Sequence, residues 1–293
     1  MSVIMAKGEA STGVAVRLAA RDETLTGVTS GLAPSYLQAN LIVLPSRYAT
    51  DFRLLCARNP VPCPLLAESA QIGSYDSLKS YIDGLKGDRI ASDIDIRHDA
   101  PQYMVYQDGR LTTSHITNIA SQWTEDHVAF LIGCSYSFET ALIGDGLPPR
   151  HTVMGRNVPM YRTNIPLCPA GAFTGSTYVV SMRPYKRSDI ERVRNITRPF
   201  VTTHGEPIAW GWHGMRNLGI ADINSPDWGD APVELDGQPL DSTNEDVVPV
   251  FWGCGVTPQE AVMKAGLKGT VLGHSPGHMI LLDVKDEDVF SIA

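Results

Sequence analysis

Three short apolar runs, each followed at once by a polar turn, constrain this chain most. Residues 127–132 lead into GCSYSFE, residues 178–182 into Arg183-Pro184, and residues 248–252 into GCGVTPQ. Runs of this length, rich in β-branched and aromatic residues and bounded by Gly or Pro, are typical of buried strands. Helical spacing resumes after each turn. The pattern therefore predicts a mixed α/β fold with polar clusters at the ends of strands.

Further segments fit the same class. Helical spacing of apolar residues, the first behind a Thr12 cap, predicts helices over residues 12–22, 48–56, 76–85, 188–196 and 259–265. Short apolar runs predict strands at 41–44, 270–272 and 279–284. Asp108-Gly109 predicts a hairpin between residues 103–106 and 111–113, because this dipeptide supplies the positive φ angles of a tight turn.

Composition excludes several classes of protein. The formal net charge is −8 and no basic block occurs, so we expect no nucleic-acid partner and no membrane surface. The N-terminus lacks the pattern of a secretory signal, which predicts a cytoplasmic protein. Five widely spaced cysteines without a C-x-x-C pair favour reduced thiols over disulfides or structural zinc. We expect a small-molecule carboxylate as the partner. The sequence leaves open whether the protein forms a homo-oligomer.

The segment GCSYSFE carries the first candidate catalytic residues, which are Cys134, Ser135, Ser137 and Glu139. If a helix begins at either serine, its free backbone N–H groups would bind a carboxylate or an oxyanion. The alternative is a helix cap with Glu139 as the acid of a capping box. Cys134 is a nucleophile or simply a packed thiol.

Arginine and histidine supply the other candidates. Arg183 at a strand end suits the capture of a carboxylate, or else forms a surface ion pair. His204 in HGEP is a candidate base or a structural residue of its turn. His274 and His278 flank a Ser-Pro-Gly turn, which argues against a helical metal pair even with Asp283 nearby. We therefore expect no metal.

The loop 155–164 is the most polar stretch without helical or strand periodicity. We expect Arg162 to clamp a substrate, with Tyr161 and Asn164 beside it, and Asn157 to brace the loop. The chain has no G-x-G-x-x-G, P-loop, G-x-S-x-G or H-E-x-x-H pattern. Nucleotide, flavin, serine-hydrolase and zinc-protease functions thus lack their usual sequence support, and no cofactor is expected.

Together these segments resemble the D-glutamate cyclase family, whose bacterial members are commonly labelled hydro-lyases. The resemblance spans nearly the whole chain and is carried by QANLIVLP (38–45), ARNPVPCPLL (57–66), FLIGCSYSFE (130–139), GRNVPMYRTNIPLCPAG (155–171), VVSMRP (179–184), GIADINSPDWGD (219–230), PVFWGCGVTPQ (249–259) and HSPGHM (274–279).

The resemblance implies an α/β protein of two interleaved subdomains. We expect a mixed-sheet three-layer core formed by residues 1–125 and 235–293, with a smaller α+β subdomain inserted at 126–234. It also implies a carbon–oxygen lyase that cyclises D-glutamate to 5-oxo-D-proline with loss of water. A specialised hydratase or dehydratase, and a non-catalytic binder of small carboxylates, are the alternatives.

Lactam closure needs a base, an acid and a stabiliser for the tetrahedral oxyanion. Arg183 is a candidate for the α-carboxylate, and Ser135 and Ser137 for the oxyanion. His204 or Glu139 would then carry protons. Alternatively, Cys134 and Cys254, which both follow apolar strands, form a two-thiol acid–base pair. The residues alone leave these schemes open.

One loop departs from the family pattern, which usually resembles HGAPVHIGDP. Here residues 204–214 read HGEPIAWGWHG, which introduces Glu206, Trp210, Trp212 and His213. If the loop lines the pocket, two indoles favour a bulkier or planar substrate. The alternative is that they pack against the protein itself. We expect GCSYSFE, MRP, HGEP, GCG and HSPGH to converge on one pocket, because each follows or flanks a short strand.

Overall fold

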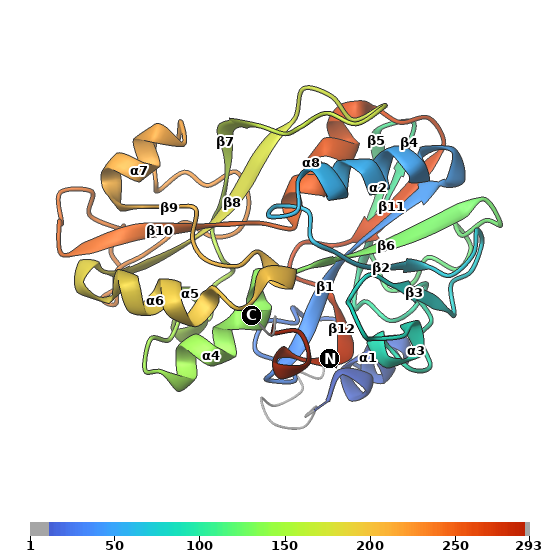
Figure 1. The fold of residues 1–293 in the computed structure, drawn as a ribbon, viewed down its shortest axis with the longest axis horizontal. Helices are drawn as coiled ribbons and strands as arrows, with labels where there is room; N and C mark the ends of the chain where they lie inside the picture. Colours follow the sequence, from blue (N-terminus) through green and yellow to red (C-terminus); the bar gives the residue numbers. More distant parts are fainter. Residues whose placement is uncertain (1–11, 291–293) are drawn as a thin grey trace.

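The computed structural model describes residues 12–290 and contains two β-sheets with helices packed around them. Figure 1 shows the smaller sheet on the left and the larger on the right, meeting at the centre of the molecule. Every strand pair among the described residues is antiparallel. The α/β class is therefore confirmed, although strand pairing is antiparallel rather than mixed.

The larger sheet follows the order β3-β2-β6-β1-β11-β4-β5, and β12 also pairs with β1. Its strands are β1 (Tyr36–Pro45), β2 (Leu65–Ser69), β3 (Leu78–Ser80), β4 (Tyr103–Gln107), β5 (Arg110–Ile116), β6 (His127–Gly133), β11 (Thr270–His274) and β12 (Ile280–Lys285). The smaller sheet, in the order β7-β8-β10-β9, consists of β7 (Met160–Pro166), β8 (Thr177–Lys186), β9 (Ala209–Trp210) and β10 (Val247–Gly253).

The helices cover both sheets. They are α1 (Gly13–Arg21), α2 (Ala49–Arg58), α3 (Gly87–Ile90), α4 (Glu139–Gly144), α5 (Arg150–Val153), α6 (Ile190–Thr197), α7 (Gly211–Asn217) and α8 (Val256–Ala265). Short 3-10 turns flank several of them. For example, η2 (Ser135–Phe138) precedes α4, and η4 (Val201–Thr203) follows α6. None of the helices within residues 12–290 has the length and apolarity that crossing a bilayer requires.

The larger sheet lies between two apolar cores. Leu41 of β1 packs into a core that includes Ile90 of α3. Its neighbour Ile42 points to the opposite face and joins a core with Phe52 of α2 and Ala261 of α8. Successive strand residues face opposite sides of a sheet, so a strand buried on both faces needs a continuous apolar run. The sequence LIVL in β1 meets that requirement.

Most of the predicted elements are present, with two corrections. The predicted helix at 76–85 is wrong, because Leu78–Ser80 pairs with β2 as strand β3. The strand at 178–182 does not stop at Arg183-Pro184 but continues to Lys186. Pro184 lies opposite Pro249 in the register. Neither proline has an N–H to donate, so this pair occupies a position where no ladder hydrogen bond is needed.

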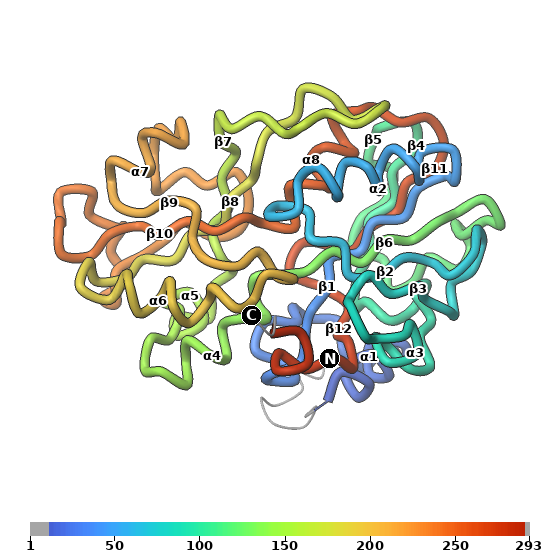
Figure 2. Tube along the Cα trace, in the orientation of Figure 1, coloured from blue at the N-terminus to red at the C-terminus, as the bar shows by residue number. Residues whose placement is uncertain are grey.

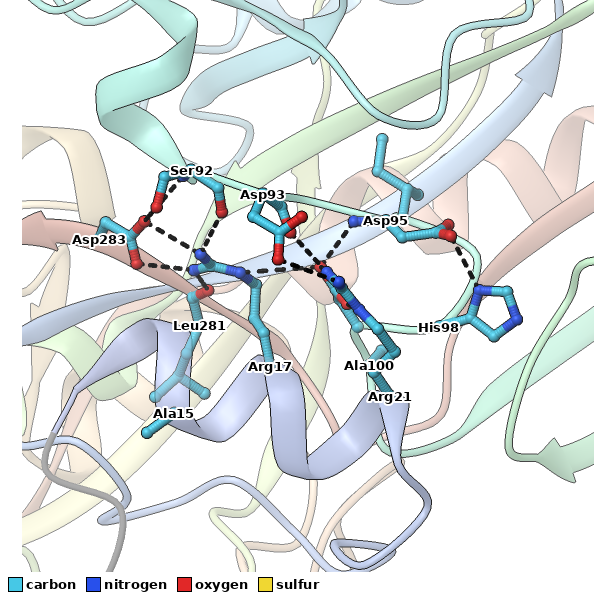
Figure 3. Close-up of polar contacts among 12 residues, drawn as sticks. Ala15, Arg17, Arg21, Ser92, Asp93, Asp95, His98, Ala100, Leu281 and Asp283 are labelled. Carbon is cyan, nitrogen blue, oxygen red and sulfur yellow. Dashed lines mark hydrogen bonds and ion pairs between the residues drawn. The ribbon is translucent and has the colours of Figure 1, made fainter.

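Helix α1 is fixed to the larger sheet by a buried arginine (Figure 3). Thr12 caps the helix, as predicted, by accepting the N–H of Ala15. Arg17, fully buried, donates to the carbonyl of Leu281 at 2.8 Å and to the Asp283 carboxylate at 2.9 Å. A guanidinium buried in this way needs an acid beside it. Asp283 is therefore occupied here, away from His274 and His278.

Candidate active site

Two strands from the two sheets end beside one another at the centre of the molecule. In Figure 1, β6 enters from the right and β10 from the left. The chain then continues into α4 and α8, which leave the centre in opposite directions (Figure 2). Cys134 directly follows β6 and Cys254 directly follows β10. Both thiols are buried in the same small apolar cluster, which places them close together between the sheets.

The two segments that carry these cysteines are built alike. GCSYSFETAL (133–142) and GCGVTPQEAV (253–262) share Gly, Cys and Ala, with Ser opposite Thr and Glu opposite Gln. The backbone N–H two residues later donates to each sulfur, from Tyr136 to Cys134 and from Val256 to Cys254. The resemblance is therefore one of structure as well as of sequence.

The hydroxyl of each segment fixes its turn to a strand of its own sheet. Ser137 accepts the backbone N–H of Gln38 in β1 at 3.0 Å, and Thr257 accepts that of Val179 in β8 at 2.9 Å. Ser137 is thus one of a matched pair of backbone braces. Its hydroxyl holds η2 against β1, which places Cys134 and Ser135 at the opening.

Glycine at Gly133 and Gly255 allows close packing behind and beside the thiols. A Cβ atom on Gly133 would lie 2.0 Å from the carbonyl oxygen of Thr202, and one on Gly255 would lie 2.0 Å from Nδ2 of Asn40. Neither contact is sterically allowed. Only glycine fits at position 133 with the backbone as it stands, whereas a side chain at position 255 would have to displace the side chain of Asn40.

A small opening with a volume of about 30 Å³ lies in front of the two thiols. It is lined by Asn40, Cys134, Ser135, Tyr136, Asn157, Val158, Met160, Cys254, Gly255, Val256, His274, Pro276, Gly277 and Met279. Three of the five predicted segments, GCSYSFE, GCG and HSPGH, therefore meet at one place. A few polar groups in an otherwise apolar opening are typical of a small-molecule site.

Behind Ser135 lies a buried ion pair. Arg183, fully buried in β8, donates through Nε and Nη2 to Oε1 of Glu139 at 2.9 and 2.5 Å. Its other hydrogen bonds go to Ser135 and Ser181. His151 Nε2 lies 3.1 Å from the same carboxylate oxygen. Burial alone would raise the pKa of Glu139, but His151 and Arg183 lower it to about 2.

In the second segment, an uncharged side chain makes the contact that corresponds to the Glu139–Arg183 ion pair. Gln259, which occupies the position of Glu139, places its Nε2 2.9 Å from Nε2 of His274 in β11. The His274 Nδ1 lies 2.8 Å from the carbonyl of Ser275, to which it donates, so Nε2 of the neutral ring carries the lone pair. Burial lowers the pKa of His274 to about 4, which keeps the ring neutral at pH 7.

Asn40 completes the surroundings of His274. Its Nδ2 donates to the carbonyl of Gly133 at 3.2 Å, which turns Oδ1 toward Nε2 of His274 at 3.0 Å. Asn40 Oδ1 and the Ser275 carbonyl can each accept a hydrogen bond from a ring nitrogen that carries a proton. Once Nε2 gains a proton, these two acceptors stabilise the imidazolium, and the NH₂ group of Gln259 must turn away from Nε2.

The two thiols are held in their protonated form. Burial raises the pKa of Cys134 to about 12 and that of Cys254 to about 11. A protonated thiol is a proton donor rather than a nucleophile. The opening thus combines a neutral imidazole that can take up a proton with two thiols that can release one.

Comparison with known proteins covers the same part of the chain. A family model described as D-glutamate cyclase matches residues 128–283, which include both cysteines and His274. The chain belongs to the D-glutamate cyclase family. The predicted resemblance is thereby confirmed, and so is the prediction of a hydro-lyase of the D-glutamate cyclase type, a carbon–oxygen lyase.

Several other proteins resemble this family member along most of their length. A "putative hydro-lyase" of Schizosaccharomyces pombe is 46% identical over 92% of this chain and 84% of its own. Proteins with the same designation from Bordetella petrii and Jannaschia sp. are 45% and 43% identical, covering 94% and 93% of this chain and 95% and 93% of theirs. A nitrogen repressor-like protein from Methanococcus jannaschii superimposes with a TM-score of 0.37 at 10% identity over 95% of this chain and 97% of its own, too weak a likeness to bear on function.

Two predicted catalytic histidines of this cyclase family member lie outside the opening. His204 is buried beneath Gly253, with Nδ1 2.8 Å from the carbonyl of Val61 and a φ of 89°. It is not among the described residues that line the opening. His278 contacts the carbonyl of Pro276 through Nδ1 at 2.9 Å and so closes its own turn. Within residues 12–290, no three His, Cys, Asp or Glu side chains are grouped to share a metal ion.

The predicted substrate clamp is spread over three places. Arg162 forms ion pairs with Asp227 and Glu260 and lies over the ring of Trp228. Tyr161 is buried and donates to the carbonyl of Ile223, while Asn164 donates to that of Asn217. Arg183 is fully buried and occupied by its own partners. None of these four is among the described lining residues.

The altered loop packs against the smaller sheet rather than the opening. Glu206 pairs with Arg194 and Arg198, and Trp210, 37% exposed, lies under Arg194. Trp212 is buried in the core of the smaller sheet and donates to the carbonyl of Asn244 at 2.8 Å. The structure therefore fits the alternative prediction, in which the two indoles of this loop pack against the protein itself.

The sequence reading missed Asn40, Tyr136 and Gln259 and took Asn157 for a loop brace. Asn157 indeed accepts the hydroxyl of Tyr136 at 2.6 Å, but both residues also line the opening. A signal for Gln259 was present, because it stands at the position of Glu139 in the second Gly-Cys segment. Asn40 carries no comparable signal, since it lies far from the other site residues in the chain.

Proposed function

We propose that this protein cyclises D-glutamate to 5-oxo-D-proline with loss of water in the opening between the two sheets. The observation that carries the proposal is the meeting of Cys134, Cys254 and His274 at one small opening. Membership of the D-glutamate cyclase family supports the choice of reaction. No ATP is required in principle, because a substrate held in a folded conformation closes a five-membered ring intramolecularly.

His274 is the proposed base. The α-amine of glutamate must lose protons before its nitrogen can attack the side-chain carboxyl carbon. When Gln259 turns its NH₂ group away from Nε2, the lone pair accepts one of these protons, and the charged ring then donates to Asn40 Oδ1 and to the Ser275 carbonyl. A general base of this kind contributes about 10²–10⁴-fold to the rate.

The thiols are the proposed acids. As the C–N bond forms, the carboxyl carbon becomes tetrahedral, and one of its oxygens must leave as water when the C–O bond breaks. Cys134 and Cys254, both protonated, each donate one proton to that oxygen. The proton held by His274 restores one thiol, and the second proton lost by the amine restores the other. Atoms balance, since one glutamate gives one lactam and one water.

Neutral donors are proposed to hold the α-carboxylate. The amide of Asn157, with its oxygen facing Tyr136, can present its NH₂ group to the substrate. Gly255, the N-cap of helix α8, lines the opening, where its backbone N–H favours an anion. Arg183 acts indirectly, by fixing Ser135 at 3.1 Å.

The test is to incubate purified protein with D-glutamate and to follow 5-oxoproline by mass spectrometry and chiral chromatography. L-glutamate, hydroxy acids and a protein-free sample complete the panel. We expect Cys134→Ser, Cys254→Ser and His274→Asn each to lower turnover about 10²-fold or more. Cys168→Ser is the matched control, because that thiol is exposed. Turnover equal to the protein-free sample, or three variants with full activity, would refute the proposal.

A further inference from the structure

A second and larger cavity adjoins the thiol opening. Its volume is about 210 Å³, against about 30 Å³ for the smaller opening, and it shares Met160, Val256, His274 and Pro276 with that opening. The imidazole of His274 thus lies on the wall between the two spaces. Any substrate that reaches Nε2 from the thiol side has this cavity directly beside it.

The lining of the second cavity is almost wholly apolar. Most of the lining comes from strands β1, β4 and β11 and from helix α8. The apolar residues are Leu41 and Ile42 of β1, Met104 and Tyr106 of β4, Val271 and Leu272 of β11, and Val262 and Met263 of α8, together with Trp228. Methionines are pliable and polarisable, and Trp and Tyr present flat faces. This chemistry suits an alkyl or aromatic group.

The polar residues of the cavity are already partnered. Glu260 pairs with Arg162 at 2.8 Å, and the Arg162 guanidinium lies 4.3 Å from the centre of the Trp228 ring. The amide of Gln259 is occupied by His274. Arg162 also pairs with Asp227, so two carboxylates share one guanidinium and the edge of the cavity keeps one unbalanced negative charge. A second carboxylate is therefore disfavoured there, which leaves the apolar walls to an uncharged substituent.

D-glutamate leaves such a space unused. All of its charged groups belong at the smaller opening, and its short chain has no apolar end to bury. A predominantly apolar cavity beside a few fixed polar groups is the usual form of a ligand site. The two spaces together match a ligand with a charged end and an apolar end.

We propose that the preferred substrate is an amino dicarboxylic acid with an apolar or aromatic substituent, and that this substituent occupies the cavity lined by Met104, Tyr106, Trp228 and Met263. The inference rests on the proposed cyclisation and names its substrate class. It places the basis for a bulkier substrate in this cavity and not in the loop 204–214. Since His274 touches both spaces, the substituent would also exclude water from the side of the base.

The experiment measures kcat/KM for D-glutamate and for its 4-methyl, 4-propyl and 4-benzyl derivatives. We expect kcat/KM to rise about fourfold for each methylene buried. Met263→Trp should fill the cavity and bring the ratio of the 4-benzyl derivative to D-glutamate down to about one. Leu54→Trp, at an exposed position of α2, is the matched control and should keep the wild-type ratio.

Three further results decide the matter. If D-glutamate is cyclised but kcat/KM stays flat or falls along the series, the substrate class is wrong while the proposed cyclisation stands. If no compound is cyclised, the cyclisation fails, and binding is followed instead by quenching of Trp228, with Trp228→Phe to assign the signal. Tighter binding of the 4-benzyl derivative would then still support the cavity, and equal binding of all four compounds would overturn it. Met263→Ala repeats the comparison should the tryptophan variant not fold.

Discussion

Replacing Glu139 by Gln tests whether the buried ion pair stabilises the fold. The change keeps the shape of the side chain and its contact with Thr152, but it leaves the Arg183 guanidinium buried without an acid. The pKa of Glu139, about 2 against an ordinary 4.5, corresponds to about 3 kcal/mol of stability at neutral pH. Removing one partner of a buried pair costs a similar amount, about 3–5 kcal/mol.

The assay is urea unfolding at pH 7, followed by tryptophan fluorescence. We expect the variant to lose about 3 kcal/mol in the free energy of unfolding. Glu206→Gln is the matched control, because its ion pairs with Arg194 and Arg198 lie at the surface and should be worth less than about 1 kcal/mol.

The pH dependence adds an independent check. A carboxylate whose pKa is lowered on folding stabilises the protein fully above its ordinary pKa and loses that contribution as the pH falls. At pH 3.5, one pH unit below the ordinary 4.5, the gap between wild type and Glu139→Gln should narrow by about 1.4 kcal/mol. A gap below about 1 kcal/mol at pH 7, or one that widens in acid, would show that the pair does not stabilise the fold in this way.

Two further predictions follow from other positions. Gly255→Ala should displace Asn40, since the new Cβ would lie 2.0 Å from its Nδ2; we expect a large loss of turnover with little change in Tm, and full activity would contradict the role of Asn40. Asp286→Asn should raise Tm at pH 8 but not at pH 4. Burial raises the pKa of Asp286 to about 7, so the folded wild-type protein loses stability as the pH rises from about 4 through 7. If differential scanning fluorimetry gives the variant and the wild type an equal Tm at pH 8, this prediction is contradicted.

Local patterns predicted most of the fold and failed where partners lie far apart in the chain. The helix at α1 and the hairpin of β4 and β5 depend on a cap and on an Asp-Gly turn, both visible within a few residues. Residues 76–85 have helical spacing as well, yet pairing with β2 makes Leu78–Ser80 a strand. A tertiary contact of this kind overrides propensity.

The same division applies to the site. Cys134, Ser135, Cys254 and His274 could be named from the sequence because each follows or ends a short apolar strand. Asn40 could not, because its contact with His274 joins residues 234 positions apart. Trp212 shows the reverse problem, since nothing in HGEPIAWGWHG distinguishes an indole at a pocket from one that donates to the carbonyl of Asn244.

The two Gly-Cys segments have the same arrangement, but we assign a structural role to the first and a reactive role to the second. In the first, Glu139 reaches from the end of β6 to Arg183 in the other sheet, and full charges lock the contact. In the second, Gln259 reaches from the end of β10 to His274 in the larger sheet, and the contact is neutral. Each helix therefore ties its own sheet to the opposite one. Because an ion pair resists a change of charge and a neutral contact permits it, we assign the proposed proton transfer to His274, and Glu139 holds Ser135 in place through Arg183.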